Sequence, residues 1–165
     1  MMKILILATF LLSSSANAEF KNAKWGMNLY DLRMVYQSGH SRKSNDGAVE
    51  YIAPMVFKNY PDSVVNFILI NDKLSAIIVD LGNKYSSVQC QEILNNLIAQ
   101  QTAEFSLPDY QDENIHAWND ISGGSIMLTS ITKKSGCAPW ITYFNKPFYK
   151  DGKFCDPFKN NSICD

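Results

Sequence analysis

Two apolar runs in the middle of the chain give its clearest strand pattern. Residues 64–70 (VVNFILI) and 74–81 (LSAIIVDL) are short, rich in β-branched residues and separated by Asn71-Asp72-Lys73, which predicts a hairpin with a three-residue loop. Only Asn66 interrupts the first run, so we expect a central strand that is covered on much of both faces. Before this pair, residues 49–57 predict a third strand.

Pro54 lies inside that third strand and indicates an edge or a bulge, because proline cannot donate to the ladder. The preceding segment from His40 to Gly47 is polar and is expected to be a loop.

Two helices are expected, each with a capping signal at its start. Asn28 can cap the first helix with Asp31 in the first turn, and Gly39 is a stop signal after it. Ser86 and Gln89 fit a capping box for the second helix. Its expected apolar stripe consists of Val88, Ile93 or Leu94, Leu97, Ile98 and Gln101, with Cys90 close by.

The second half of the chain repeats the order of the first. After a loop at 105–112 we expect a short segment at 115–118 and two strands at 125–132 and 137–145. The fold class is therefore α+β, an antiparallel sheet with two helices on one face. One interpretation is a tandem αβββ duplication of 28–81 and 86–145; the alternative is an α+β domain without duplication.

The first eighteen residues predict a cleaved secretory signal. Lys3 gives a positive start, an apolar run spans Ile4–Leu12, and Ala16-Asn17-Ala18 has the small-x-small pattern of a cleavage site. The run is shorter than the ~20 residues that cross a bilayer, so no stable membrane anchor is expected. Because Glu19 follows, and not cysteine, the lipoprotein route is not expected either. The alternative is a buried N-terminal helix.

Cleavage after Ala18 would leave 147 residues, the size of one domain. We expect a domain at 19–147 and a C-terminal tail at 148–165, which lacks a hydrophobic period. The mature chain would keep 14 of the 15 basic residues and all 16 acidic residues, a formal net charge of −2. This near-neutral charge argues against nucleic acid as a partner.

The four cysteines Cys90, Cys137, Cys155 and Cys164 all lie in the mature part, and an even number in an exported chain predicts two disulfides. Cys90 lies early in the second helix and Cys137 opens the last strand, which favours pairing them and stapling the tail with Cys155–Cys164. Pairs that link the tail cysteines to Cys90 and Cys137 are the alternative. No two cysteines are two to four residues apart, so no metal site is expected.

No group of residues indicates catalysis or a cofactor. His40 and His116 could serve as bases, but Gly123-Gly124-Ser125 lacks the nucleophile-elbow pattern and is better explained by a turn. Cys90 near a helix start could be an activated thiolate, but pairing in a disulfide is favoured. The acids Asp109, Asp112, Glu113 and Asp120 lack a calcium-loop register and are expected in a solvated loop.

Aromatic residues make up 12% of the chain, and core packing is the favoured interpretation for most of them. If both helices cover one face of the sheet, the other face needs an explanation. In that case Tyr51, Tyr143 and the tryptophans Trp25, Trp118 and Trp140 could line an open surface for a protein partner.

The segment Phe20 to Met27, with Trp25-Gly26-Met27 before a helix and a hairpin, resembles small bacterial periplasmic proteins, whose helical and strand cysteines are similar to Cys90 and Cys137. The helix-plus-sheet order of residues 20–145 also resembles beta-lactamase inhibitory protein and the small barrel-assembly lipoproteins. The resemblance implies the fold, an envelope compartment and a protein partner. It transfers no inhibitory residue, and the missing lipid-attachment cysteine departs from the lipoprotein pattern.

These observations lead to the hypothesis of a periplasmic or secreted, non-enzymatic protein-binding module, such as an inhibitor, an immunity protein or an envelope accessory protein. The alternative is a secreted hydrolase with an unrecognised active site. Convergent polar side chains in a deep pocket would favour the enzyme, and a broad sheet face would favour the binding module.

Overall fold

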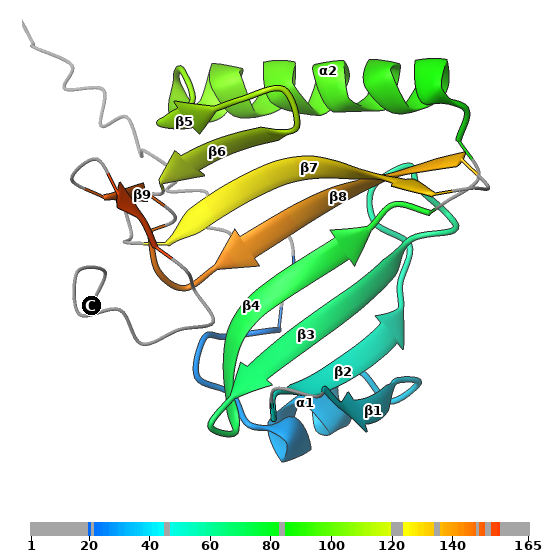
Figure 1. Ribbon diagram of the computed structural model, residues 1–165. Coiled ribbons are helices and arrows are strands. Elements are labelled where there is room, and N and C mark those ends of the chain that lie inside the picture. The colour runs from blue at the N-terminus through cyan, green and yellow to red at the C-terminus, as the bar shows by residue number, and fades with distance from the viewer. Residues whose placement is uncertain are drawn as a thin grey trace, which may run out of the picture.

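A computed structural model describes residues 20, 22–44, 47–82, 85–119, 124–133, 136–147, 149–150 and 153–155. The described residues form two helices and ten strands (Figure 1). The helices are α1 (Leu29–Val35) and α2 (Ser87–Phe105). The strands are β1 (His40–Lys43), β2 (Val49–Pro54), β3 (Val64–Ile70), β4 (Lys73–Asp80), β5 (Tyr110–Gln111), β6 (Ile115–Asn119), β7 (Ser125–Lys133), β8 (Gly136–Phe144), β9 (Tyr149–Lys150) and β10 (Lys153–Phe154).

Eight strands form one antiparallel sheet in the order β1-β2-β3-β4-β8-β7-β6-β5. Each half of the chain is a helix followed by four strands that pair with their neighbours in sequence, and the two halves meet where β4 pairs with β8. The α+β class is therefore confirmed. The element order is αββββ in each half, one strand more than expected, and duplication itself stays a prediction.

The additional strands, β1 and β5, are short polar strands in segments that we expected to be loops. β1 pairs with β2 from His40↔Ile52 to Lys43↔Val49, and β5 pairs with β6 at only two positions. Among the described residues, both are edge strands of the sheet. An edge strand can form by backbone pairing with one neighbour, so β1 and β5 do not need alternating apolar residues. The loop prediction for His40–Gly47 was therefore wrong over His40–Lys43, whereas Ser44 and Gly47 lie outside any strand.

The hairpin between β3 and β4 has a two-residue turn, not the expected three. Asn71 and Asp72 both have positive φ, at 52° and 58°, and Lys73 already pairs with Ile70. Asparagine and aspartate tolerate this conformation better than most residues, which explains their place in the turn.

The predicted Asn28 cap and the predicted Ser86–Gln89 capping box are confirmed, and Asn28 and Asp31 also form a complete capping box. The Asn28 side chain accepts a hydrogen bond from the Asp31 N–H at 3.0 Å, and the Asp31 carboxylate accepts one from the Asn28 N–H. In α2, the Ser86 hydroxyl accepts from the Gln89 N–H and the Gln89 side chain accepts from the Ser86 N–H. Each box satisfies donors that the first turn of a helix leaves unpaired.

Alternate residues of the strands form the main core on one face of the sheet, which we call the helix face. One aligned row across β2, β3, β4, β8, β7 and β6 consists of Tyr51, Phe67, Ile77, Tyr143, Ile126 and Trp118. The same core cluster contains Leu32 of α1 and Leu97 of α2. Both helices therefore pack on the helix face, α2 over the β6–β8 side and α1 at the opposite end beside β1 and β2 (Figure 1).

The segment before α1 completes this core. Phe20 is 1% exposed, and its ring lies 5.5 Å from the ring of Tyr143 and 6.0 Å from that of Phe57 between centroids. Gly26 and Met27 exchange backbone hydrogen bonds with Leu74 at the start of β4. The segment is thus fixed at both ends, by burial of Phe20 and by this backbone pair.

Residues after β8 attach to the sheet where β6 ends and β7 begins. The Asn119 side chain donates to the Tyr149 carbonyl at 2.7 Å, and the Ser125 hydroxyl donates to the Lys146 carbonyl at 2.8 Å. β9 and β10 pair with each other as a small hairpin, and the rings of Tyr110 and Tyr149 are 5.7 Å apart. Residues 156–165 of the predicted tail lie outside the described residues.

Candidate functional site

The second face of the sheet, which we call the outer face, carries no described helix. Its residues alternate with those of the core. One row crosses all eight strands through His40, Ile52, Asn66, Ile78, Thr142, Met127, Ala117 and Tyr110. Thr142 and Ala117 of this row are buried, and the other six side chains are exposed or partly exposed.

The middle of the outer face is apolar and partly accessible. Ile68, Ala76 and Phe144 form a small buried cluster, separate from the main core, and Ile78 and Met127 pack against it while remaining partly exposed. Trp140 belongs to the same face and is also partly exposed. A buried apolar centre with partly exposed large side chains beside it is typical of protein-binding surfaces.

Few charged side chains lie within the rows of the outer face. Arg42 and Glu50 form an ion pair of 2.6 Å, and Asp80 accepts a hydrogen bond from the Gly82 N–H at 2.9 Å. Because the charges of Arg42 and Glu50 compensate each other, this ion pair adds little net charge beside the apolar middle of the outer face.

The surface role expected for the aromatic residues was wrong for Tyr51, Tyr143 and Trp118. Each is at most 2% exposed and lies in the core under the helices, as the core interpretation expected. Trp25 also packs against that core and is partly buried. Trp140 alone of the three tryptophans has the strand register of the outer face.

The two histidines lie far apart in the sheet. His40 is exposed in β1 and has the register of the outer face, whereas His116 is in β6 on the helix face, opposite Leu128. The His116 ring stacks beside Trp118 with centroids 6.4 Å apart. The structure therefore does not bring the two candidate bases together.

Two of the candidate acids are engaged in the turns around β5 and β6. Asp112 accepts hydrogen bonds from the Asn114 and Ile115 N–H groups and from the Tyr110 hydroxyl, and these bonds hold the pKa of Asp112 below its ordinary value. The same hydroxyl bond raises the pKa of Tyr110. Asp109 accepts from the Asn119 N–H at 2.7 Å, and Asp120 lies outside the described residues. Both carboxylates thus have structural partners.

The glycine-serine segment is explained by packing. A Cβ atom on Gly124 would lie 2.7 Å from the Phe144 carbonyl oxygen, so a side chain is excluded there. Ser125 is 1% exposed and donates to the Lys146 carbonyl. Gly123 lies outside the described residues. The buried position of Ser125 fits a turn and strand start better than a nucleophile.

The predicted pairing of Cys90 with Cys137 is confirmed, with Cα atoms 5.9 Å apart. Its sulfur atoms are therefore not available as a thiolate nucleophile. Cys155 is also disulfide-bonded and 1% exposed. Cys164 lies outside the described residues, so Cys155–Cys164 stays a prediction.

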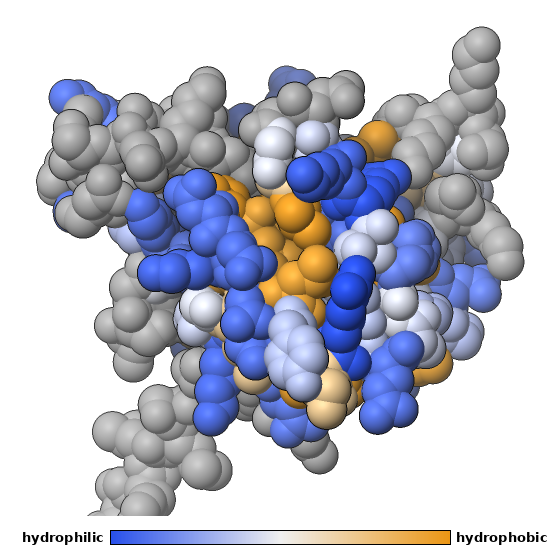
Figure 2. All heavy atoms as spheres, turned by 90° about the horizontal axis from the view of Figure 1, so that it is seen from below, coloured by the Kyte–Doolittle hydropathy of each residue, from blue (hydrophilic) through white to orange (hydrophobic). Residues whose placement is uncertain are grey.

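A second apolar area lies at the α1 end of the molecule. Figure 2 views the molecule from the side of α1, β1 and β2 and shows apolar side chains in a hollow with hydrophilic side chains around it. On α1 itself, Tyr30 is 70% and Met34 is 61% exposed. These two side chains provide a useful comparison for any test of the outer face.

Across the part of the chain that the structure describes, no helix is both long enough and apolar enough to cross a membrane. The same part contains no group of three or more His, Cys, Asp and Glu residues that could hold a metal ion.

The fold and its outer face define an α+β protein with one eight-stranded antiparallel sheet and both helices on one side. Comparison with protein families, with curated proteins and with solved structures finds no match. The resemblance to beta-lactamase inhibitory protein and the barrel-assembly lipoproteins therefore stays a prediction.

Proposed function

We propose that the protein is an exported, non-enzymatic binding module whose protein partner docks on the outer face. The observation that carries this proposal is the group of partly exposed apolar side chains on the sheet face opposite the two helices, namely Ile52, Ile78 and Met127. Large apolar side chains that are grouped and partly exposed on one face are typical of protein interaction sites. Inhibitors, immunity proteins and envelope accessory proteins all act by such docking.

The Cys90–Cys137 disulfide supports the exported location, because disulfides persist mainly outside the cytoplasm. The Ala16-Asn17-Ala18 pattern supports it independently, with Glu19 as the first residue of the mature protein. N-terminal sequencing of exported material should give Glu19.

Site-specific photo-crosslinking tests the docking face. A photoreactive phenylalanine derivative is placed in turn at Ile52, Ile78 and Met127 on the outer face and at Tyr30 and Met34 on α1, and the protein is produced in its source cells. We expect one partner protein in adducts from the outer-face positions and no such adduct from α1.

Adducts of one protein from α1 only would move the docking site to that end of the molecule. Absence of a specific adduct from all three outer-face positions, in variants with unchanged thermal unfolding, would contradict the proposal. A small-molecule product formed by the purified protein would instead favour the hydrolase.

A further inference from the structure

The predicted cleavage site comes directly before a buried residue. Hydrolysis of the Ala18–Glu19 bond adds water across it and leaves a carboxyl group on Ala18 and an α-amino group on Glu19. Ala18 and Glu19 lie outside the described residues, whereas Phe20, the second residue after the bond, is 1% exposed. Residues 1–18 are part of the chain in which Phe20 is buried, so this burial does not require cleavage.

Three aromatic rings surround the ring of Phe20. Between centroids, the ring of Tyr143 is 5.5 Å away, that of Phe57 is 6.0 Å away and that of Phe67 is 6.3 Å away. Withdrawal of Phe20 would expose its ring to water and leave a cavity among the other three, and both changes are unfavourable.

The backbone after Phe20 is also held in place. The Phe20 carbonyl accepts a hydrogen bond from the Ala23 N–H at 2.8 Å, and Ala23 is 4% exposed. Further along, the Gly26 N–H donates to the Leu74 carbonyl at 3.1 Å, and the Met27 carbonyl accepts from the Leu74 N–H at 2.8 Å. Residues 20–27, which we call the N-terminal segment, are therefore not available as an extended strand while these contacts persist.

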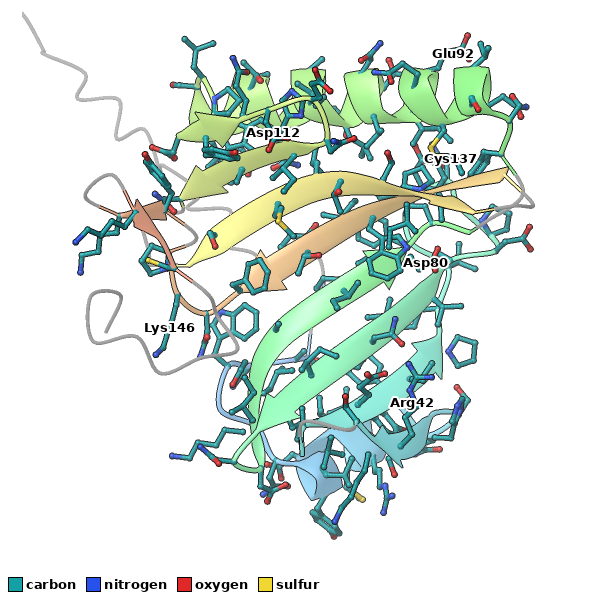
Figure 3. The ribbon with its side chains drawn as sticks, in the orientation of Figure 1. Arg42, Asp80, Glu92, Asp112, Cys137 and Lys146 are labelled. Atoms are coloured by element: carbon teal, nitrogen blue, oxygen red, sulfur yellow. A yellow bond between two sulfur atoms is a disulfide. The ribbon has the colours of Figure 1, made fainter. Side chains whose placement is uncertain are left out.

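Opening of the N-terminal segment is a local event. Tyr143 belongs to β8, and the Cys90–Cys137 disulfide joins β8 to α2. Figure 3 shows Cys137 under the start of α2, with Lys146 beyond the far end of β8. Because the covalent bond does not include the N-terminal segment, this segment can open while α2 stays in place.

Proteolysis needs such an opening. A bound peptide in extended form occupies its site with residues on both sides of the recognised position. Cleavage of a folded chain therefore follows the population in which the backbone around the scissile bond is open. The burial of Phe20 keeps this population small.

We propose that signal peptidase cleaves this chain only while the N-terminal segment is open, so that closure of the segment over the core blocks maturation. Cleavage then precedes closure during export, and a chain that folds first retains residues 1–18. This inference rests on the proposed function, because it takes the exported location and the Ala18–Glu19 site from it.

Cleavage of the full 165-residue chain by purified signal peptidase in detergent micelles tests this order. The folded, oxidised chain is compared with Val65→Asp/Leu128→Asp, which keeps the sequence around the cleavage site but should not fold, because it places charges at two positions that are at most 1% exposed. Circular dichroism checks both states. We expect the folded chain to be cleaved about tenfold or more slowly than the unfolded variant.

An inserted spacer distinguishes burial from the local sequence. Gly-Ser-Gly-Ser-Gly-Ser between Glu19 and Phe20 moves the scissile bond away from the buried ring, and the folded chain should then be cleaved within about threefold of the rate of the unfolded variant with the same insert. The matched control has this insert between Leu107 and Pro108, after α2, where Leu107 is 80% exposed. The control should be cleaved as slowly as the folded chain without an insert.

The outcomes separate the two proposals. Equal cleavage of the folded and unfolded chains would overturn the inference and leave the exported location standing. Slow cleavage of the folded chain that the spacer does not relieve would also overturn it, because burial of Phe20 would not be the cause. If the unfolded variant itself is not cleaved after Ala18, the predicted signal is wrong, and the exported location and this inference fail together.

Discussion

The two helices of this protein are held on the same sheet face by different means. α1 has seven residues and buries only Leu32, and the segment around Phe20 adds the remaining apolar contacts. α2 has nineteen residues and buries Cys90, Leu97 and Gln101, and a disulfide joins its first turn to β8.

The difference shows two solutions to one packing problem. A short helix cannot cover its half of the sheet, so a separate apolar segment completes the cover. A long helix covers enough area, but its buried stripe includes Gln101, whose Oε1 has no hydrogen-bond partner among the described residues. Burying an unpaired polar atom destabilises the packing of that helix. The Cys90–Cys137 disulfide offsets such a loss by holding the helix on β8.

Removal of Phe20 is expected to have the largest effect on stability. Phe20→Ala, in the mature protein that begins at Glu19, should lower the free energy of unfolding by about 3 to 5 kcal/mol, because a buried ring leaves a cavity between Phe57, Phe67 and Tyr143. Urea unfolding measures it. Leu107→Ala is the control, since Leu107 is 80% exposed, with a change within about 0.5 kcal/mol. An equal, small loss for both variants would show that the N-terminal segment does not support the core.

Loss of the disulfide should have the next largest effect. Cys90→Ser/Cys137→Ser should lower the free energy of unfolding by about 2 to 4 kcal/mol, toward the upper value because the cysteines are 47 residues apart. Cys155→Ser/Cys164→Ser should lower the free energy of unfolding less than the first double variant does, because this pair would close a loop of only about 10 residues. Non-reducing peptide mapping of the wild type first tests whether Cys155 and Cys164 pair. A larger loss from the tail variant would make the tail, and not α2, the element that needs a covalent bond.

The smallest effect concerns the turn between β5 and β6 in the second half. The pKa of Asp112 is lowered, so its stabilising contribution is present above the ordinary carboxyl pKa of 3.8 and is lost as the pH falls through the lower pKa of the folded protein. Tyr110→Phe removes one donor and should raise the pKa of Asp112 in an NMR titration, while the bonds from Asn114 and Ile115 remain. An unchanged pKa would mean that the two N–H donors alone determine it.

Features that depend on residues close together in sequence were predicted well. The cap at Asn28 and the capping box at Ser86–Gln89 need only residues close in sequence and helical geometry. The Cys90–Cys137 pair followed from placing a helix start beside the strand that should lie under it. In these cases local chemistry and the tertiary fold agree, so the pattern is sufficient.

Features that depend on tertiary neighbours were missed. β1 and β5 are polar strands that form because β2 and β6 offer a free ladder edge, and no residue pattern within them indicates it. Val88 was assigned to the buried stripe of α2 but is 69% exposed. With about 3.6 residues per turn, it lies on the opposite side of the helix from the buried residues Cys90, Leu97 and Gln101. The outer face could be inferred only as a consequence of helix placement, and its residues emerged from the strand register.

The strand order has a consequence for how the chain reaches this structure. Every ladder within β1–β4 and within β5–β8 joins strands that are neighbours in sequence, so each half can form through short loop closures. The β4–β8 ladder alone brings together distant segments, as at Ala76↔Phe144. We expect this seam to form last during folding, and pulsed hydrogen exchange should show late protection of its amides. Phe20 contacts Phe67 in the first half of the sheet and Tyr143 in the second half. The N-terminal segment therefore packs across the seam between two halves that form early.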